Sequence, residues 1–238
     1  MYVMTIDQRG SSADMDRVPA ILDELRGLTA SRFERSVGDE VQGVVPDAAE
    51  VVDIALHALR SGRWYVGIGA GAVDTPLTGS PREGSGAAFV AARQAVDQAK
   101  SSAGHVPVSV VSGASVRGIS ESVLAAEATR ACANAEAVMR LIGRLIQGRT
   151  AAQWKVVDAL RGVQEGKAGQ QGKTGRHGSQ KLAARELGIT EQSVSRAVLR
   201  SGWQEEWAAR PAAEMLLATA HGLILRSAEP GAHHQGDR

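Results

Sequence analysis

The chain has 238 residues, of which 43% are hydrophobic and only 3% aromatic, and its 27 basic and 26 acidic residues nearly cancel. This length accommodates one large domain or two small ones, with cores built from Ala, Val, Leu and Ile. The sequence has no apolar run of about 18 residues and no signal-peptide pattern, so we expect a cytoplasmic protein without a membrane partner. The single cysteine, Cys132, excludes an internal disulfide.

The first half of the chain alternates between strand and helix patterns. Short apolar runs indicate strands over 2–6, 33–37, 41–45, 63–73 and 106–112. Apolar residues at helical spacing indicate helices over 14–28, 47–60 and 87–101. The order β-α-β-β-α-β-α-β predicts an α+β fold in which residues 1–118 form a ferredoxin-like domain.

Three glycines alternate along the strand expected over 63–73, at Gly67, Gly69 and Gly71. Side chains are therefore missing from one face of that strand. Glycine weakens a strand, so its repeated use predicts that another segment packs closely against this face.

Two aspartates are expected to meet at one end of the sheet. Asp7 ends the first strand, and Asp39 lies in the turn of the hairpin, within Gly38-Asp39. Two adjacent carboxylates are costly unless a cation neutralises them, and hard oxygen ligands suit Mg²⁺ with a polyphosphate. Asp7 and Asp39 are therefore candidate metal ligands. Alternatively, Asp7 caps a turn and Asp39 serves only the hairpin.

Four short motifs carry a resemblance to a known family: Asp7–Gly10 (DQRG), Val37–Gly43 (VGDEVQG), Gly67–Gly71 (GIGAG) and Gly86–Arg93 (GAAFVAAR). Together they resemble the SatD-like family and, more remotely, class III nucleotidyl cyclases and diguanylate cyclases. The resemblance covers residues 1–112 and implies a nucleotidyl-cyclase-like, palm-like fold. It also implies a nucleotide ligand with Mg²⁺ on Asp7 and Asp39, and it makes Arg93 and Arg82 candidate nucleotide-binding residues.

One departure from the cyclase pattern bears on catalysis. Class III cyclases carry an asparagine four residues before the helix arginine, and here that position is Phe89. Loss of a residue that acts in the transition state lowers the rate steeply even where binding survives. We therefore expect a degenerate domain that is not an enzyme.

Residues 179–203 predict two short helices joined by a tight turn. Ala184 is the small residue where the helices cross, Gly188 tolerates the positive φ of the turn, and Thr190 occupies the N-cap of the second helix. Apolar residues that hold this helix down are Leu187, Ile189, Val194 and Val198. This spacing is typical of a DNA-binding helix-turn-helix. An ordinary helical hairpin within a larger core is the alternative.

We expect the second helix to lie in the major groove of double-stranded DNA. Candidate DNA contacts on the two helices are Lys181, Thr190, Gln192, Ser193, Ser195, Arg196 and Arg200. Lys173 and Arg176 are further candidates from the Gly-rich segment 165–179, which either touches phosphate or is a solvated loop. Residues 149–203 hold ten basic and four acidic residues, a balance of +6, against −3 before them and −2 after them. Such clustering favours phosphate contact.

The remaining segments complete an all-α second domain. A long helix over 119–148 connects the halves, and it packs on the sheet, pairs with a second copy or transmits motion to the DNA-binding part. The helix-turn-helix domain covers 149–226, with a leading helix over 151–163 and a closing helix over 211–226. Residues 227–238 read as a disordered tail.

The sequence thus predicts a sequence-specific transcriptional regulator that binds DNA as a homodimer. Its degenerate cyclase-like domain dimerises, with a nucleotide as candidate ligand. The alternative is an active nucleotidyl cyclase-type phosphoryl-transfer enzyme with an accessory helix-turn-helix, and a third possibility is a scaffold for other proteins. Phe89 disfavours the enzyme, whereas Asp7, Asp39 and Arg93 favour it.

Overall fold

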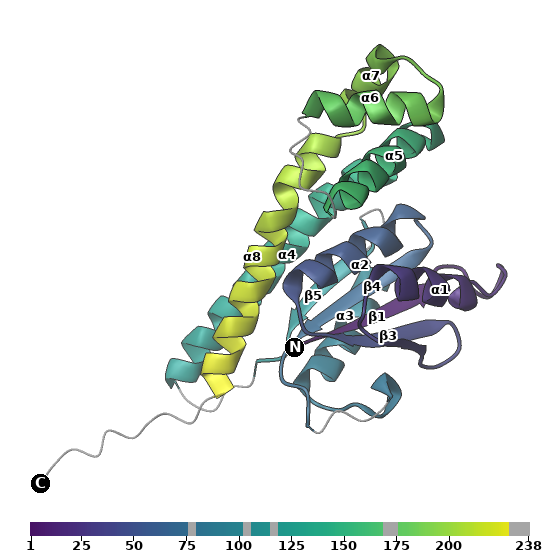
Figure 1. The fold of residues 1–238 in the computed structure, drawn as a ribbon. Coiled ribbons are helices and arrows are strands. Elements are labelled where there is room, and N and C mark those ends of the chain that lie inside the picture. Colours follow the sequence, from purple (N-terminus) through teal and green to yellow (C-terminus); the bar gives the residue numbers. More distant parts are fainter. Residues whose placement is uncertain (76–79, 102–105, 115–118, 169–175, 229–238) are drawn as a thin grey trace, which may run out of the picture. The chain divides into compact units, whose positions relative to one another are not determined.

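A computed structural model describes residues 1–75, 80–101, 106–114, 119–168 and 176–228 (Figure 1). Over these residues the chain is α+β, with one five-stranded mixed sheet and eight α-helices. It divides into two compact units, residues 1–143 with 210–238 and residues 144–209. None of the helices in the described part is both long and apolar enough to span a membrane.

The first unit contains the whole sheet. Its strands are β1 (Tyr2–Gln8), β2 (Phe33–Arg35), β3 (Glu40–Val45), β4 (Trp64–Ala70) and β5 (Val108–Ser112). They lie in the order β2-β3-β1-β4-β5. Neighbours among the first four strands are antiparallel, whereas β5 is parallel to β4. Every residue of β1 is buried because this strand occupies the centre of the sheet.

Helices cover both faces of this sheet (Figure 1). The helices of this unit are α1 (Val18–Leu28), α2 (Ala48–Arg60), the 3₁₀-helix η1 (Pro81–Glu83), α3 (Ala87–Ser101), most of α4 (Ile119–Gln147) and the later part of α8 (Trp203–Ala228). The carboxylate of Asp47 accepts hydrogen bonds from the amides of Ala49 and Glu50 and so caps the start of α2. One face carries α1 and α2, and the opposite face carries α3.

The glycines of β4 allow α3 to lie directly on the sheet. A Cβ on Gly67 would lie 2.3 Å from the backbone nitrogen of Val96, and one on Gly69 would lie 2.2 Å from the carbonyl oxygen of Ala88. No side chain fits at either position. The predicted close packing is confirmed, and the segment that packs there is the backbone of α3.

Side chains of α4 occupy the hydrogen-bonding groups of the edge strand β5. The Glu136 carboxylate accepts from the Val110 amide at 2.9 Å and from the Ser109 hydroxyl at 2.7 Å. The Nε of Arg140 donates to the Val108 carbonyl at 3.1 Å. An uncovered edge strand invites pairing with other chains, and these contacts prevent it. Three roles were expected for this helix: packing on its own sheet, pairing with a second copy and transmitting motion. These contacts show the first of them.

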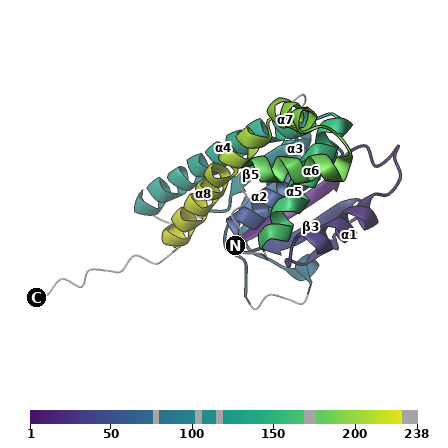
Figure 2. The same ribbon diagram turned by 45° about the horizontal axis from the view of Figure 1, so that its top comes forward.

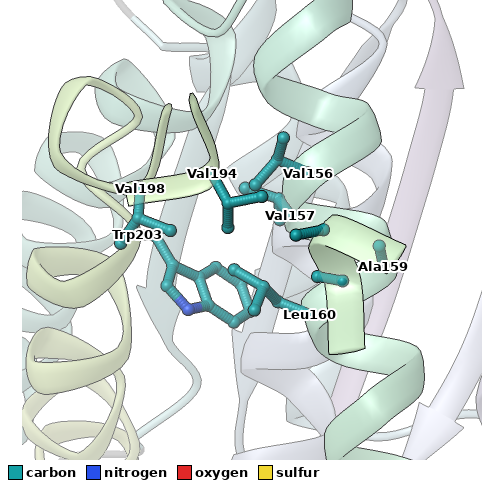
Figure 3. Close-up of a cluster of buried hydrophobic side chains, with 9 residues drawn as sticks. Val156, Val157, Ala159, Leu160, Val194, Val198 and Trp203 are labelled. Carbon is teal, nitrogen blue, oxygen red and sulfur yellow. The ribbon is translucent and has the colours of Figure 1, made fainter. Parts of the chain in front are cut away.

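The second unit is entirely helical. It contains α5 (Ala151–Ala168), α6 (Arg176–Leu187) and α7 (Glu191–Arg200), with the end of α4 and the start of α8. The three complete helices group together in both views (Figures 1 and 2). In their common core, Val194 and Val198 of α7 point toward α5, and the ring of Trp203 closes one side (Figure 3).

The last helix begins earlier than the sequence pattern indicates. The expected helix over 211–226 is part of α8, which starts at Trp203 and carries Pro211 in its interior. Proline is typical of a helix's first turn, whereas Pro211 lies in the interior of α8, where it removes one backbone hydrogen bond. The boundary between the two units lies beside it, between Ala209 and Arg210. Of the expected tail, residues 227–228 complete α8 and residues 229–238 lie outside the described residues.

Candidate functional site

The connection between α6 and α7 is a tight turn with the predicted chemistry. Gly188 has a φ of +64°, and the amide of Ile189 donates to the Ala184 carbonyl at 3.1 Å. Thr190 is the N-cap of α7, and its hydroxyl accepts from the Ser193 amide at 3.2 Å. These bonds satisfy backbone groups that a helix end otherwise leaves unpaired. They therefore stabilise the turn and the start of α7.

Three of the four expected apolar residues hold α7 in place. Val194 and Val198 are buried in the core of the unit, and Leu187 packs against it. Ile189 does not belong to this core and is 41% exposed. It lies between the turn glycine and the N-cap, where the backbone has not yet entered the helix that faces α5.

The opposite side of α7 presents polar side chains to solvent. Gln192, Arg196 and Arg200 are exposed and four residues apart, so they form one ridge along the helix. Ser195 is exposed beside this ridge, and Thr190 is exposed at its start. These predicted residues are thus gathered on one surface. Helix side chains in such a row are able to reach base edges and phosphates together.

The other predicted DNA contacts differ from this group. Ser193 is half-buried, and its hydroxyl lies 2.9 Å from that of Thr190, so its first role is to stabilise the turn. Lys181 is exposed on α6. Arg176 begins α6, but its side chain is not among those described, and Lys173 lies outside the described residues.

Leu199 is an exposed residue that the sequence pattern did not single out. Its side chain is 76% exposed. Apolar helix residues are expected to face a core, but Leu199 follows Arg196 by three positions and Gln192 by seven, which places it on the outward side. An apolar side chain at such a place suits contact with the methyl group of thymine.

At the end of the sheet, the first unit brings together three carboxylates. The register sets Asp7 of β1 opposite Glu40 of β3 and Tyr65 of β4. The amide of Gln8 donates to the carbonyl of Asp39 at 3.3 Å, so the hairpin turn lies beside the end of β1. The expected approach of Asp7 and Asp39 is therefore present, and Glu40 adds a third carboxylate.

Lys100, near the end of α3, completes this cluster and was not predicted. Its Nζ lies 2.7 Å from Oδ2 of Asp7. Burial raises the pKa of Asp7 and outweighs the bond to Lys100, which lowers it. Burial and the charge of Asp7 likewise raise the pKa of Glu40. Burial is the largest single effect on Lys100 and lowers its pKa, but the hydrogen bond to Asp7 and the negative charges of Asp7, Asp97 and Glu40 together raise this pKa above its ordinary value.

The donor set at this end of the sheet does not fit a divalent cation in the present arrangement. Among the described side chains, no three His, Cys, Asp or Glu residues are grouped so as to hold a metal ion. Asp7 is instead bonded to the ammonium group of Lys100. The assignment of Mg²⁺ to Asp7 and Asp39 stays a prediction.

The candidate nucleotide-binding residues lie on and near α3. Arg93 is exposed in a shallow depression of about 540 Å³ shared with Asp97 and Gln98, and its charge lowers the pKa of Glu40 against the stronger effect of burial. Arg82 belongs to η1, but its side chain is not among those described. Phe89 is buried with Val3 in the core between α3 and the sheet.

Compared with protein-family models, curated proteins and solved structures, the chain gives no significant match. Two sites on the described part of the chain are therefore the basis for a functional proposal. One is the polar ridge on α7, and the other is the carboxylate cluster at the end of the sheet.

Proposed function

We propose that the protein is a sequence-specific DNA-binding regulator in which α6 and α7 form a helix-turn-helix and α7 is the recognition helix. The exposed ridge of Gln192, Arg196 and Arg200 carries this proposal. Arginine and glutamine are the side chains that form paired hydrogen bonds with guanine and adenine in the major groove. The other face of α7 is packed on α5, so the ridge is held in a fixed orientation.

The charge of the surrounding segment supports the same proposal. The +6 balance of residues 149–203 lies on the stretch that contains α5, α6 and α7. Exposed basic residues such as Lys181 supply contacts to phosphate that do not depend on sequence. We further propose a homodimer, because two copies present two recognition helices to adjacent half-sites and double a small interface.

We also propose that the first unit is a ferredoxin-like, nucleotidyl-cyclase-like domain related to the SatD-like family. The order β2-β3-β1-β4, with antiparallel neighbours, supports this proposal because a βαββαβ unit produces that order. The proposed role of the domain is to assemble the dimer and to bind a nucleotide, without turnover. Phe89 supports the lack of turnover, because its ring fills a core position and offers no hydrogen bond.

Selection of a duplex site from random DNA, followed by fluorescence anisotropy with the full chain, tests the DNA proposal. Arg196→Ala and Gln192→Ala are expected to weaken binding by about 1–3 kcal/mol each and to relax base preference at single positions. Lys181→Ala is expected to weaken binding to all sequences and to reduce the salt slope by about 1. Arg130→Ala, on the exposed face of α4, is the control and retains full affinity.

Three results would contradict the proposals. Failure to enrich any sequence, or full affinity in both Arg196→Ala and Gln192→Ala, rules out α7 as the recognition helix. Sedimentation that shows only a monomer, both free and on DNA, rules out the homodimer.

A further inference from the structure

We propose that Lys100 is a tethered cation that takes the place of a divalent metal at the carboxylate end of the sheet and excludes that metal from Asp7. This inference concerns the first unit and does not depend on DNA binding. If it is correct, an anionic ligand at this site binds to protein cations without a metal bridge.

The backbone packing of α3 determines where Lys100 lies. Gly67 and Gly69 leave no space for a Cβ, so α3 rests on β4 with its backbone. Gly67 is paired with Thr5 of β1, two residues before Asp7. The last turn of α3 is thereby carried to the end of β1, where the Nζ of Lys100 lies 2.7 Å from Oδ2 of Asp7. The contact joins residues 93 positions apart and follows from the fold.

The Asp7 side chain is only 10% exposed, whereas that of Lys100 is 39% exposed. The carboxylate of Asp7 is therefore largely buried, and its ion-pair partner belongs to a more exposed side chain. A metal ion that binds Oδ2 of Asp7 must displace the ammonium group of Lys100. It must also bind near a positive charge, and that repulsion is larger at a partly buried site than in water.

The charges around Asp7 are already partly balanced. Negative charge near Asp7 comes from the carboxylates of Asp39, Glu40 and Asp97. Positive charge that balances it comes from Lys100 and Arg93. Mg²⁺ requires near-octahedral oxygen ligands and gives up water reluctantly. At this site the buried carboxylate of Asp7 is already neutralised by an ammonium group. Binding of Mg²⁺ there would therefore contribute little free energy to offset the cost of removing its water.

Manganese binding, measured by the electron paramagnetic resonance signal of free Mn²⁺, tests the inference on the full chain. We expect the wild-type protein to leave that signal unchanged, and Lys100→Met to bind one Mn²⁺ at least tenfold more tightly. Lys100→Arg retains the positive charge and is expected to behave like the wild type. Lys155→Met, at an exposed lysine of α5, is the matched control.

Asp7→Asn combined with Lys100→Met removes both members of the pair and is expected to lose the gained binding, which assigns the ion to Asp7. Lys100→Gln is a second neutral variant that still donates a hydrogen bond to Asp7 if Lys100→Met does not fold. Wild-type Mn²⁺ binding within threefold of the neutral variants would overturn the inference. Equally, it fails if no folded neutral variant binds Mn²⁺, because Lys100 is then not what excludes the metal.

Discussion

The Nη2 of Arg149 lies 2.6 Å from the carboxylate of Glu206, and neither side chain is exposed to solvent. The Nε of Arg149 donates to the carbonyl of Ser201, the C-cap of α7, at 2.8 Å. The other Glu206 oxygen lies 2.9 Å from Arg161 of α5. One carboxylate therefore connects α5 and the start of α8, and through Arg149 the end of the proposed recognition helix.

Replacement of Glu206 is expected to destabilise the second unit strongly. Glu206→Gln removes the negative charge from two arginines, and breaking a buried pair in this way costs about 3–5 kcal/mol. Urea unfolding followed by tryptophan fluorescence measures the loss, because Trp154, Trp203 and Trp207 belong to this unit. Glu205→Gln, the exposed neighbour, is the control and is expected to change stability by less than about 0.5 kcal/mol. Equal stability of the two variants would contradict the role of the buried pair.

The turn before α7 depends on a glycine for conformational reasons alone. Gly188 has a φ of +64°, yet a Cβ there would meet no atom within 4 Å. Gly188→Ala is therefore expected to cost about 1–2 kcal/mol from the left-handed backbone. Gly162→Ala is the matched control, because Gly162 lies in α5 with the same free space and no positive φ. Alanine in this helix is expected to raise the free energy of unfolding by about 0.5–1 kcal/mol. Effects of the same sign in the unfolding free energy would show that backbone conformation does not matter at Gly188.

Local patterns predicted most elements of this chain. Helix α3 begins at Ala87 and ends at Ser101, where the apolar spacing placed it, and the turn glycine and N-cap of α7 were found from their residue types. Such features depend on neighbours within a few positions. The predicted start of the last helix at Pro211 was wrong, because α8 begins at Trp203 and residue propensity does not indicate a helix that continues through a proline.

Contacts between distant residues were beyond the sequence pattern. Lys100 resembles any basic residue at the end of a helix, and only the packing of α3 on the β4 glycines brings it to Asp7. Glu206 resembles the exposed acid beside it, although its side chain has no exposed surface. The exposed positions of α7 at Gln192, Arg196 and Arg200 were predictable from the sequence, because helical spacing alone determines which side chains share a face; their contact with DNA stays a prediction. The carboxylate cluster was predicted only in part because it is assembled from two strands, a hairpin turn and a helix.

Stability of the first unit is expected to depend on pH through His221. Its ring lies 5.4 Å from that of Tyr2 and its Nε2 bonds the N-terminal amino group. Burial, with the charge of that amino group, lowers the pKa of His221 from 6.5. The unfolded state then binds the proton more readily, so the contribution of His221 is complete above pH 6.5 and is lost as pH falls through the lowered pKa.

His221→Gln removes this titration while it keeps a hydrogen-bonding side chain. Between about pH 7.5 and pH 5.5, a window that brackets the ordinary histidine pKa, the wild type is expected to lose more thermal stability than the variant. Far-UV circular dichroism at each pH measures the two midpoints. Parallel pH profiles of wild type and variant would show that His221 does not titrate differently on folding.

Cyclase activity would follow if the resemblance to nucleotidyl cyclases extended to chemistry. We expect no cyclic nucleotide from ATP or GTP with Mg²⁺ or Mn²⁺. Phe89, at the position of the cyclase asparagine, packs in the core with Val3, and Asp7 is bonded to Lys100. Both a group that acts on the transition state and a free metal ligand are therefore missing from the position that the resemblance assigns.

Chromatography of reaction mixtures with the full chain measures any product. Asp7→Ala serves as the matched control, because contaminating cyclase activity persists in that variant and activity of the chain itself does not. Product at the same level in both proteins fits the regulator. Turnover well above background in the wild type that disappears in Asp7→Ala would instead establish the enzyme alternative. The helix-turn-helix would then be an accessory part, and any nucleotide bound at the sheet end would be a substrate.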